Sequence, residues 1–220
     1  MTAVIFDLDG TLADTSGDLL AAANLCFRDM GLGDVLGAAD AGVALRGGRA
    51  MLRAGLARVD QLHEGTVDRY YPVLLEAYGA AISVHTRLYP GAMEAIGVLK
   101  SHGHAVGICT NKPEALAEQL MSDLGVRDQF GSLIGADTLP VRKPDPEPLF
   151  EATRRLGVDP RACLLVGDSD TDRKTARAAG VPSVLVTFGP SGDDMAALEP
   201  EALLEDYAAL PAVVATLLNR

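Results

Sequence analysis

The 220-residue sequence has few cysteines, and their spacing offers no obvious cross-link. Only Cys26, Cys109 and Cys163 are present, an odd number separated by long stretches of chain. Such spacing gives neither a disulfide framework nor a cysteine-based zinc site. We therefore expect three buried structural thiols in a reducing compartment, which predicts a cytoplasmic protein.

The sequence also lacks a long hydrophobic run. It contains no apolar stretch of 18 residues, so no membrane span is expected. The apolar run at the N-terminus has no basic lead and is interrupted by aspartates, which argues against a secretory signal.

Positive charge is scarce, since the formal net charge is -11. Proteins that bind nucleic acid usually carry a basic patch, so no nucleic-acid partner is expected. A small anionic substrate remains compatible with this charge, because a metal ion, one lysine or a helix N-terminus can hold a phosphate locally.

Five short segments are rich in β-branched and aliphatic residues, and they comprise residues 3–7, 104–110, 132–136, 163–168 and 182–187. Each is compatible with a strand that is buried on both faces. Helical patterns separate most of these segments, and residues 196–210 have ordinary helix composition. The alternation predicts an α/β fold with a doubly wound, mostly parallel, Rossmann-like sheet.

The alternation stops between Asp14 and about His85, where only helical patterns occur. We predict a small all-helical cap domain at residues 14–85, inserted after the first strand. The core domain would then comprise residues 1–13 and 86–220. Residues 14–17 and 83–90 would be the hinges.

Polar residues stand at or near the carboxyl ends of the predicted strands. Asp7 and Asp168 end two of these segments, Thr110 ends a third, and Lys143 follows a fourth. Ligands of open α/β sheets bind at the carboxyl ends of the strands, so we expect these four residues to converge there.

The segment around Asp7 fits covalent phosphoryl transfer. An ordinary aspartate is ionised at neutral pH, so Asp7 can attack phosphorus without a partner base. Asp9, two residues later, can give a proton to the leaving alcohol and then accept one from the attacking water. Gly10 permits the turn by which the chain leaves the strand.

Charge balance calls for a divalent cation. A phosphate dianion beside ionised Asp7 and Asp168 brings about four negative charges together, and Lys143 offsets one of them. Clustered oxygen ligands suit Mg²⁺. The predicted metal ligands are the carboxylates of Asp7 and Asp168 and the backbone carbonyl of Asp9.

Four motifs resemble those of the haloacid dehalogenase-like superfamily of phosphohydrolases, and they occur in the same order and at similar spacing: FDLDGTL, ICTNK, RKPDPEPL and LLVGDSDTD. The resemblance covers the whole predicted core. It implies that Asp7 is the nucleophile and that Asp9 is the acid/base.

The same resemblance implies roles in the other three motifs. Thr110 would donate a hydrogen bond to the phosphoryl group, and Lys143 would neutralise the phosphate and the nucleophile. Asp168 would bind the metal, with Asp172 supporting either the metal or Lys143. Ser169 would cap the following helix or touch the site.

Further residues narrow the choice within the superfamily. True dehalogenases lack the second aspartate, so Asp9 argues against dehalogenation. Sugar-phosphate mutases often have valine after the DxDG sequence, whereas Thr11 here resembles a phosphatase. Asn111 and Lys112 can orient the phosphate through their backbone N–H groups.

The position of the insertion resembles the helical cap of the phosphoglycolate phosphatase branch. The substrate 2-phosphoglycolate carries a carboxylate, for which the predicted core offers no partner. Arg46 and Arg49, beside two glycines in the cap, are the candidates for substrate binding, because guanidinium groups pair with carboxylates through two parallel hydrogen bonds.

We therefore predict a Mg²⁺-dependent phosphoric monoester hydrolase that acts on a small phosphorylated metabolite, most readily 2-phosphoglycolate, as a monomer or homodimer. One alternative is another phosphatase of the superfamily, acting on nucleotides, pyridoxal phosphate or pyrophosphate. A sugar phosphomutase and a non-enzymatic phosphate-binding module are the remaining alternatives.

Overall fold

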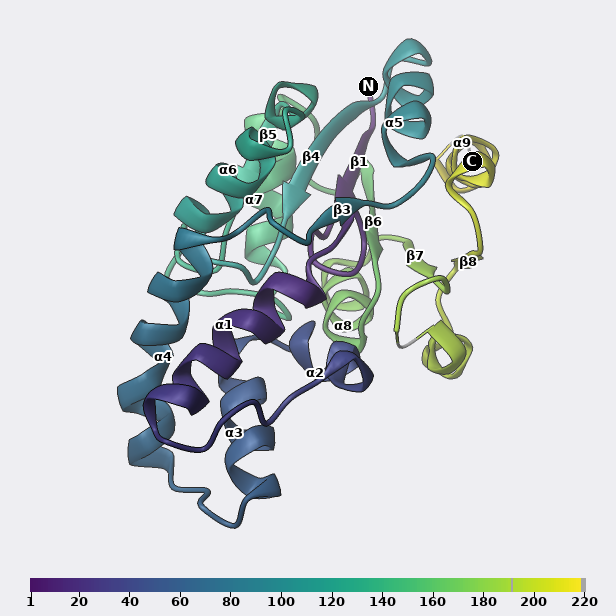
Figure 1. Ribbon diagram of the computed structural model, residues 1–220. Coiled ribbons are helices and arrows are strands. Elements are labelled where there is room, and N and C mark those ends of the chain that lie inside the picture. Colours follow the sequence, from purple (N-terminus) through teal and green to yellow (C-terminus); the bar gives the residue numbers. More distant parts are fainter. Residues whose placement is uncertain (191, 219–220) are drawn as a thin grey trace. The chain divides into compact units, whose positions relative to one another are not determined.

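The structure is a computed structural model that describes residues 1–190 and 192–218 (Figure 1). It contains two compact units, which we call the core unit (Met1–Ala13 with Leu88–Arg220) and the insert unit (Asp14–Arg87). The assignment of residues 14–85 as a cap domain, separate from a core domain of 1–13 and 86–220, remains a prediction, because compactness alone does not demonstrate independent folding.

A six-stranded sheet forms the centre of the core unit, in the order β5-β4-β1-β6-β7-β8. Its strands are β1 (Ala3–Phe6), β4 (Ala105–Cys109), β5 (Ser132–Ile134), β6 (Cys163–Gly167), β7 (Ser183–Val186) and β8 (Ala202–Leu204). All neighbouring pairs are parallel. The predicted α/β fold is confirmed, and the first five of these strands lie within the five predicted segments.

Residues 196–210 have helix composition, but residues 199–206 within them are not helical. A 3-10 helix (Gly192–Leu198) ends at Glu199, whose φ is 54°, and Pro200 follows. The chain then forms β8, which pairs with β7 so that Leu203 lies opposite Leu185. This edge strand is stabilised by its partner, which local composition does not reveal.

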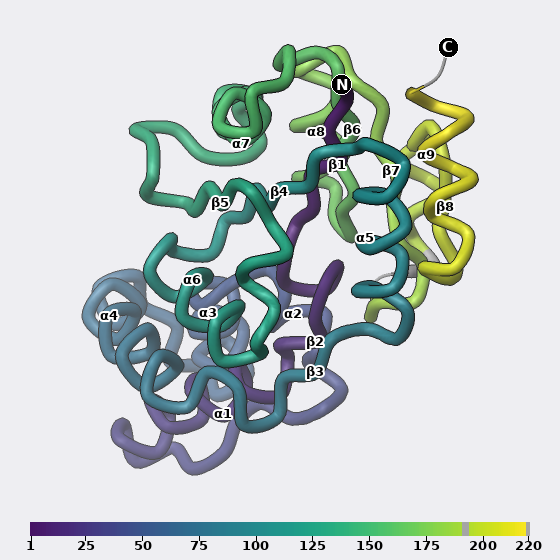
Figure 2. The backbone as a smooth tube through the Cα atoms, turned by 90° about the horizontal axis from the view of Figure 1, so that it is seen from above, coloured from purple at the N-terminus to yellow at the C-terminus, as the bar shows by residue number. Residues whose placement is uncertain are grey.

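Helices cover both faces of the sheet, as a doubly wound fold requires. Figure 2 shows α7 (Glu147–Arg155) and α8 (Asp170–Ala179) on one face, and α5 (Ala92–Ser101) and α9 (Leu210–Leu218) on the other. α6 (Glu114–Asp123) packs against β5. The short helices η2 (Arg127–Gln129) and η4 (Tyr207–Ala209) complete the core unit.

Strand β1 is buried on both faces, and its side chains alternate between them. Ile5 joins an apolar cluster with Leu149 of α7 and Leu165 of β6. Phe6 packs edge-on against Phe130, with the ring centroids 6.4 Å apart. The apolar run that precedes Asp7 thus fixes the end of β1 between two packed layers.

The insert unit is built from helices α1 (Ser16–Asp29), α2 (Ala41–Ala44), α3 (Gly48–Arg58) and α4 (Glu64–Ala80), with η1 (Ala38–Asp40). A Cβ on Gly55 would lie 2.1 Å from the Phe27 ring, so glycine is needed where α3 approaches α1. Two-residue strands β2 (Ala13–Asp14) and β3 (Arg87–Leu88) form a small sheet at the predicted hinges, which the sequence analysis missed.

Asp18 ties the two ends of the insert unit together. Its buried carboxylate accepts hydrogen bonds from the backbone N–H groups of His85 at 2.9 Å and Thr86 at 2.8 Å. The Thr86 hydroxyl donates a further bond at 2.8 Å. The start of α1 and the segment before β3 are therefore joined by one side chain.

The three cysteines are buried and unpaired, as predicted. Burial raises the pKa of Cys26 to about 11 and that of Cys109 to about 12, so both thiols stay protonated at neutral pH. Among the described helices, none combines the length and the apolar character that crossing a bilayer would require.

Candidate active site

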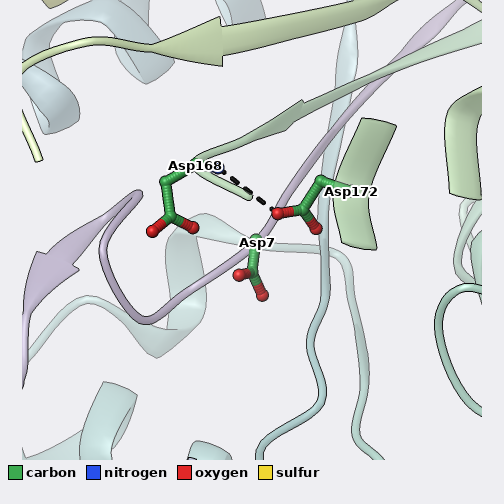
Figure 3. A group of neighbouring side chains, drawn as sticks. All are labelled: Asp7, Asp168 and Asp172. Atoms are coloured by element: carbon green, nitrogen blue, oxygen red, sulfur yellow. Dashed lines mark hydrogen bonds between the residues drawn. The ribbon is translucent and has the colours of Figure 1, made fainter. Parts of the chain in front are cut away.

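Three carboxylates meet at the carboxyl ends of two neighbouring strands (Figure 3). Asp7 follows β1 and Asp168 follows β6, and the parallel register places Phe6 opposite Val166. Asp172 comes from the first turn of α8. Carboxylate oxygens of the three residues lie within 4.8 Å of one another. The sheet therefore brings together residues that are far apart in the sequence.

Lys143 lies between two of these carboxylates. Its ammonium nitrogen is 2.9 Å from Asp7 Oδ1 and 2.6 Å from Asp172 Oδ1. The Lys143 side chain is only 2% exposed. The two aspartates raise its pKa further than burial lowers it, so Lys143 is a permanent cation in the site.

The Asp7 carboxylate is poorly satisfied within the protein. Its Oδ1 is buried and, among the described residues, receives no hydrogen bond of good geometry, although it forms the ion pair with Lys143. Burial is the main cause that raises the pKa of Asp7 to about 6, against the opposing effect of Lys143. The charges of Asp172 and Asp9 raise it further.

The pKa of Asp168 is also raised by burial. This pKa lies well above the ordinary value, and the negative charges of Asp172 and Asp7 add to the rise. A cation bound among these oxygens would lower both pKa values. The raised pKa values of Asp7 and Asp168 and the close approach of three buried carboxylates together indicate that the group fits a metal ion.

Asp172 is held in place by several partners besides Lys143. Its Oδ2 accepts hydrogen bonds from the Ser169 hydroxyl at 2.5 Å and from the Asp168 backbone N–H at 3.3 Å. Ser169 is also the N-cap of α8 and accepts a bond from the Asp172 N–H. Gly167 permits this packing, because a Cβ there would lie 2.4 Å from Asp172 Cβ.

A residue in the turn after β1 forms a hydrogen bond with Asp168. Gly10 adopts a φ of 81°, a left-handed conformation that glycine accommodates without strain. Thr11 is fully buried, and its hydroxyl donates a hydrogen bond to Asp168 Oδ1 at 3.2 Å. The Tyr207 hydroxyl donates to the Thr11 carbonyl at 2.8 Å. Thr11 thus has a supporting contact with a candidate metal ligand.

Thr110 and Asn111 follow β4, the other neighbour of β1 in the sheet. Thr110 is buried, and its Oγ1 accepts a hydrogen bond from the Lys112 backbone N–H at 3.2 Å. The Asn111 side chain donates to the Lys143 carbonyl at 3.0 Å. Asn111 therefore holds the loop that carries Lys143, whereas its predicted role in substrate binding remains a prediction.

Lys112 is the residue that the sequence analysis underestimated. Its ammonium nitrogen lies 2.8 Å from Asp9 Oδ1 and 3.1 Å from Asp9 Oδ2, and its side chain is only 4% exposed. The core unit therefore holds a second buried ammonium group, beside the predicted acid/base. That the core offers no partner for a substrate carboxylate stays a prediction. The ICTNK motif could have indicated that Lys112 lies near the site, because Lys112 follows Thr110 by only two residues.

The predicted metal ligands are only partly brought together. Asp7 and Asp168 belong to the cluster, with Asp172 as its third carboxylate. The Asp9 carboxylate pairs with Lys112 instead. A role for the Asp9 backbone carbonyl stays a prediction.

The two arginines predicted to bind substrate belong to the insert unit. Arg49 pairs with Asp68 at 2.5 Å, and its guanidinium lies 4.5 Å from the centre of the Tyr71 ring. Arg46 is exposed. Their role in recognising a carboxylate remains a prediction.

Comparison with known proteins places the chain in a family. The haloacid dehalogenase-like hydrolase family matches residues 1–180. A protein of Mesorhizobium japonicum named phosphoglycolate phosphatase is 39% identical over 99% of this chain and 96% of its own length. One of Rhodospirillum rubrum with the same name is 38% identical over 94% of this chain and 88% of its own.

Solved structures agree with the sequence comparison. The crystal structure of a predicted phosphoglycolate phosphatase from Haemophilus somnus matches with a TM-score of 0.83 and 26% identity, covering 97% of this chain and 98% of that one. The family match spans most of the chain, and the fold and the aspartate cluster agree with it. The chain is therefore a member of the haloacid dehalogenase-like hydrolase family.

Proposed function

We propose that this protein is a Mg²⁺-dependent phosphomonoester hydrolase that acts on 2-phosphoglycolate through a phosphorylated Asp7. The observation that carries the proposal is the buried Asp7 carboxylate, which lies in a cluster with Asp168 and 2.9 Å from the Lys143 ammonium. The substrate is supported by the relatives named phosphoglycolate phosphatase, which align over nearly the whole chain.

In the first step, a carboxylate oxygen of Asp7 forms a bond to phosphorus while the bond between phosphorus and the leaving oxygen breaks. Asp9 donates a proton to that leaving oxygen. In the second step, water attacks the phosphorus and loses a proton to Asp9, and the bond to Asp7 breaks. Asp7 and Asp9 are thereby restored, and the products are the alcohol and inorganic phosphate.

Thr110 and Lys143 would hold the phosphoryl group during both steps. Lys143 is a buried cation 2.9 Å from Asp7, so its charge offsets the repulsion between an anionic nucleophile and an anionic phosphate. Thr110 is buried at the end of the strand beside β1, and its hydroxyl would donate a hydrogen bond to a phosphoryl oxygen. Both would position the phosphorus for attack.

Asp7 and Asp168 would hold the Mg²⁺ ion, together with the Asp9 backbone carbonyl. Asp172 is better suited to support, because its oxygens already accept bonds from Lys143, Ser169 and the Asp168 N–H. When bound, the ion supplies positive charge that attracts the phosphate oxygens. Oxygen ligands of this kind favour Mg²⁺ over softer metals.

Charge balance within the core unit agrees with a divalent ion. Four carboxylates lie in this region, on Asp7, Asp9, Asp168 and Asp172, and the two ammonium groups of Lys112 and Lys143 face them. Fully ionised, these groups leave two uncompensated negative charges. One Mg²⁺ would neutralise them before a phosphate enters.

The alternatives are other phosphatases, a sugar phosphomutase and a binding module without turnover. Phosphate release from a panel of about fifty phosphorylated metabolites, with isomerisation assayed in parallel, separates these functions. We expect release from 2-phosphoglycolate to require Mg²⁺ and to exceed release from nucleotides, pyridoxal phosphate and pyrophosphate. Isomerisation without release would instead favour a mutase.

Asp7→Asn tests the proposed nucleophile. The amide keeps the size of the side chain but is not a nucleophile, so turnover should be abolished while the fold persists. Asp34→Asn is the matched control, because Asp34 is an exposed partner of Arg28 and should be dispensable. Retained phosphatase activity in Asp7→Asn, with normal unfolding behaviour, would refute the role of Asp7.

The cytoplasmic location and the monomeric or homodimeric state also belong to this proposal. Three buried, unpaired cysteines agree with a reducing compartment. Light scattering of the purified protein measures the oligomeric state directly, and a larger assembly would contradict the expectation.

A further inference from the structure

We propose that Lys112 is a specificity-determining residue that binds the carboxylate of the leaving group. This inference rests on the proposed function, since it requires Asp9 to face the leaving oxygen of the substrate. It assigns recognition of the second anionic group of 2-phosphoglycolate to the core unit rather than to Arg46 and Arg49.

Lys112 is held in a fixed position within the core unit. Its backbone N–H donates to Thr110 Oγ1 at 3.2 Å, and its carbonyl accepts from the Ala136 N–H at 2.9 Å. The backbone is therefore fixed on both sides. The side chain is almost fully buried and ends at the Asp9 carboxylate.

The distances bring the ammonium within reach of the leaving group. A general acid must lie about 2.6–3.2 Å from the oxygen that it protonates. The Lys112 nitrogen lies 2.8 Å and 3.1 Å from the two oxygens of Asp9, which would be that acid. In 2-phosphoglycolate, the carboxylate oxygens lie roughly 2.7–3.6 Å from the leaving oxygen, given ordinary bond lengths and angles. A carboxylate of this reach can contact the Lys112 nitrogen while Asp9 contacts the leaving oxygen.

The two buried lysines of the site differ in their surroundings. Lys143 contacts Asp7 and Asp172, so it belongs to the nucleophile side of the cluster. Lys112 contacts Asp9, on the side of the proposed acid. An ammonium group carries several N–H donors and can serve more than one anion. Lys112 can therefore hold Asp9 and a substrate carboxylate together.

The arginines of the insert unit are weaker candidates on physical grounds. Arg49 is 41% exposed and already pairs with Asp68. Exposed ion pairs contribute little free energy, because water and salt screen the attraction between their charges. A buried ammonium acts in a lower effective dielectric, where its attraction for a carboxylate is stronger.

The test compares two substrates that differ only at the proposed contact. In 2-hydroxyethyl phosphate, an uncharged hydroxymethyl group replaces the carboxylate of 2-phosphoglycolate. The measured quantity is the ratio of kcat/KM for 2-phosphoglycolate to that for 2-hydroxyethyl phosphate, with saturating Mg²⁺. We expect Lys112→Met to lower this ratio by roughly 10- to 100-fold, as loss of a charged hydrogen bond does.

Two further variants serve as controls. Lys112→Arg keeps a cation and should retain most of the preference. Lys174→Met removes an exposed lysine that pairs with Asp170 on α8, and it should leave the ratio unchanged. Thermal unfolding of each variant checks that the fold persists.

The possible outcomes separate the inference from the proposed function. A wild-type protein without preference for 2-phosphoglycolate would overturn the proposed substrate. A preference that survives Lys112→Met, or an equal loss for both substrates, would overturn the inference and leave Lys112 as a residue that only positions Asp9. Loss of the preference in Arg46→Ala or Arg49→Ala, but not in Lys112→Met, would also overturn it.

If Lys112→Met is completely inactive, a binding measurement tests the inference instead. The dissociation constants of both compounds are measured with Asp7→Asn protein, with and without Lys112→Met, in the presence of Mg²⁺. We expect the double variant to lose roughly 10-fold or more in affinity for 2-phosphoglycolate and little for 2-hydroxyethyl phosphate. Equal affinities of the two proteins for 2-phosphoglycolate would overturn the inference.

Discussion

Replacing Gly167 by alanine should damage both stability and activity, although it adds only one methyl group. A Cβ at this position would lie 2.4 Å from Asp172 Cβ and Cγ and 2.6 Å from its Oδ2. Gly167 ends β6 and is part of the central sheet, so Asp172 must move. Movement of Asp172 separates it from Lys143, from which it now lies at 2.6 Å.

The expected magnitude follows from these contacts. Overpacking of a well-packed interior costs about 1–3 kcal/mol in the free energy of unfolding. Breaking a buried ion pair completely costs about 3–5 kcal/mol. We therefore expect a loss of at least about 1 kcal/mol, and up to about 5 kcal/mol if Asp172 loses Lys143. A displacement of about 1 Å in a catalytic site can lower the rate about 100-fold, and we expect such a loss in kcat/KM.

Gly97→Ala is the matched control for this prediction. Gly97 lies within α5, and among the residues that the structure describes no heavy atom beyond its own helix would lie within 4 Å of an added Cβ. Alanine is favoured over glycine inside a helix by about 1 kcal/mol, so this variant should be slightly more stable and fully active. Urea unfolding and steady-state kinetics measure both variants. Gly167→Ala with wild-type stability and activity would refute the reasoning about the approach of Asp172.

Three other predictions follow from particular side chains. Asp9→Asn should slow turnover, because the amide cannot exchange the proton, yet Mg²⁺ affinity measured by titration calorimetry should change little; wild-type rates would contradict the acid/base role. Asp18→Ala should lower the free energy of unfolding by about 2–4 kcal/mol, because it removes the acceptor of the His85 and Thr86 N–H groups and the shorter of the two bonds of the Thr86 hydroxyl. Urea unfolding with no loss would contradict this. Metal-free protein should lose stability as pH rises from about 4 to 6, because the raised pKa of Asp7, about 6, means that the folded state retains a proton that the unfolded state releases. Added Mg²⁺ should reverse this loss in a pH series of unfolding curves, and a pH-independent free energy would contradict the predicted coupling.

Much of the core unit could be predicted, because buried strands and parallel sheets follow general sequence patterns. Apolar segments bounded by polar residues gave five of the six strands of the central sheet, and parallel strands carry their carboxyl ends to one edge. Asp7 and Asp168 were therefore expected near each other, and neighbouring strands β1 and β6 place them so. The short strand β8 escaped prediction because it depends on pairing with β7, not on its own composition.

The less predictable features are contacts between side chains of separate segments. Lys112 and Asp9 are separated by more than a hundred residues, and no local pattern indicates that they pair. The same holds for Asp18, whose partners lie at the far end of the insert unit. Gly167 is a third example, because the reason for glycine is the nearby Asp172 and not the conformation of the strand.

The most direct test of the account is to locate the phosphoryl group during turnover. Protein mixed with 2-phosphoglycolate and Mg²⁺ is quenched in acid within one turnover, digested, and mapped by mass spectrometry. The account predicts a phosphorylated peptide that contains Asp7, which appears before free phosphate and is absent from Asp7→Asn. Phosphate release at the normal rate, with no phosphorylated Asp7 at any time point, would contradict it.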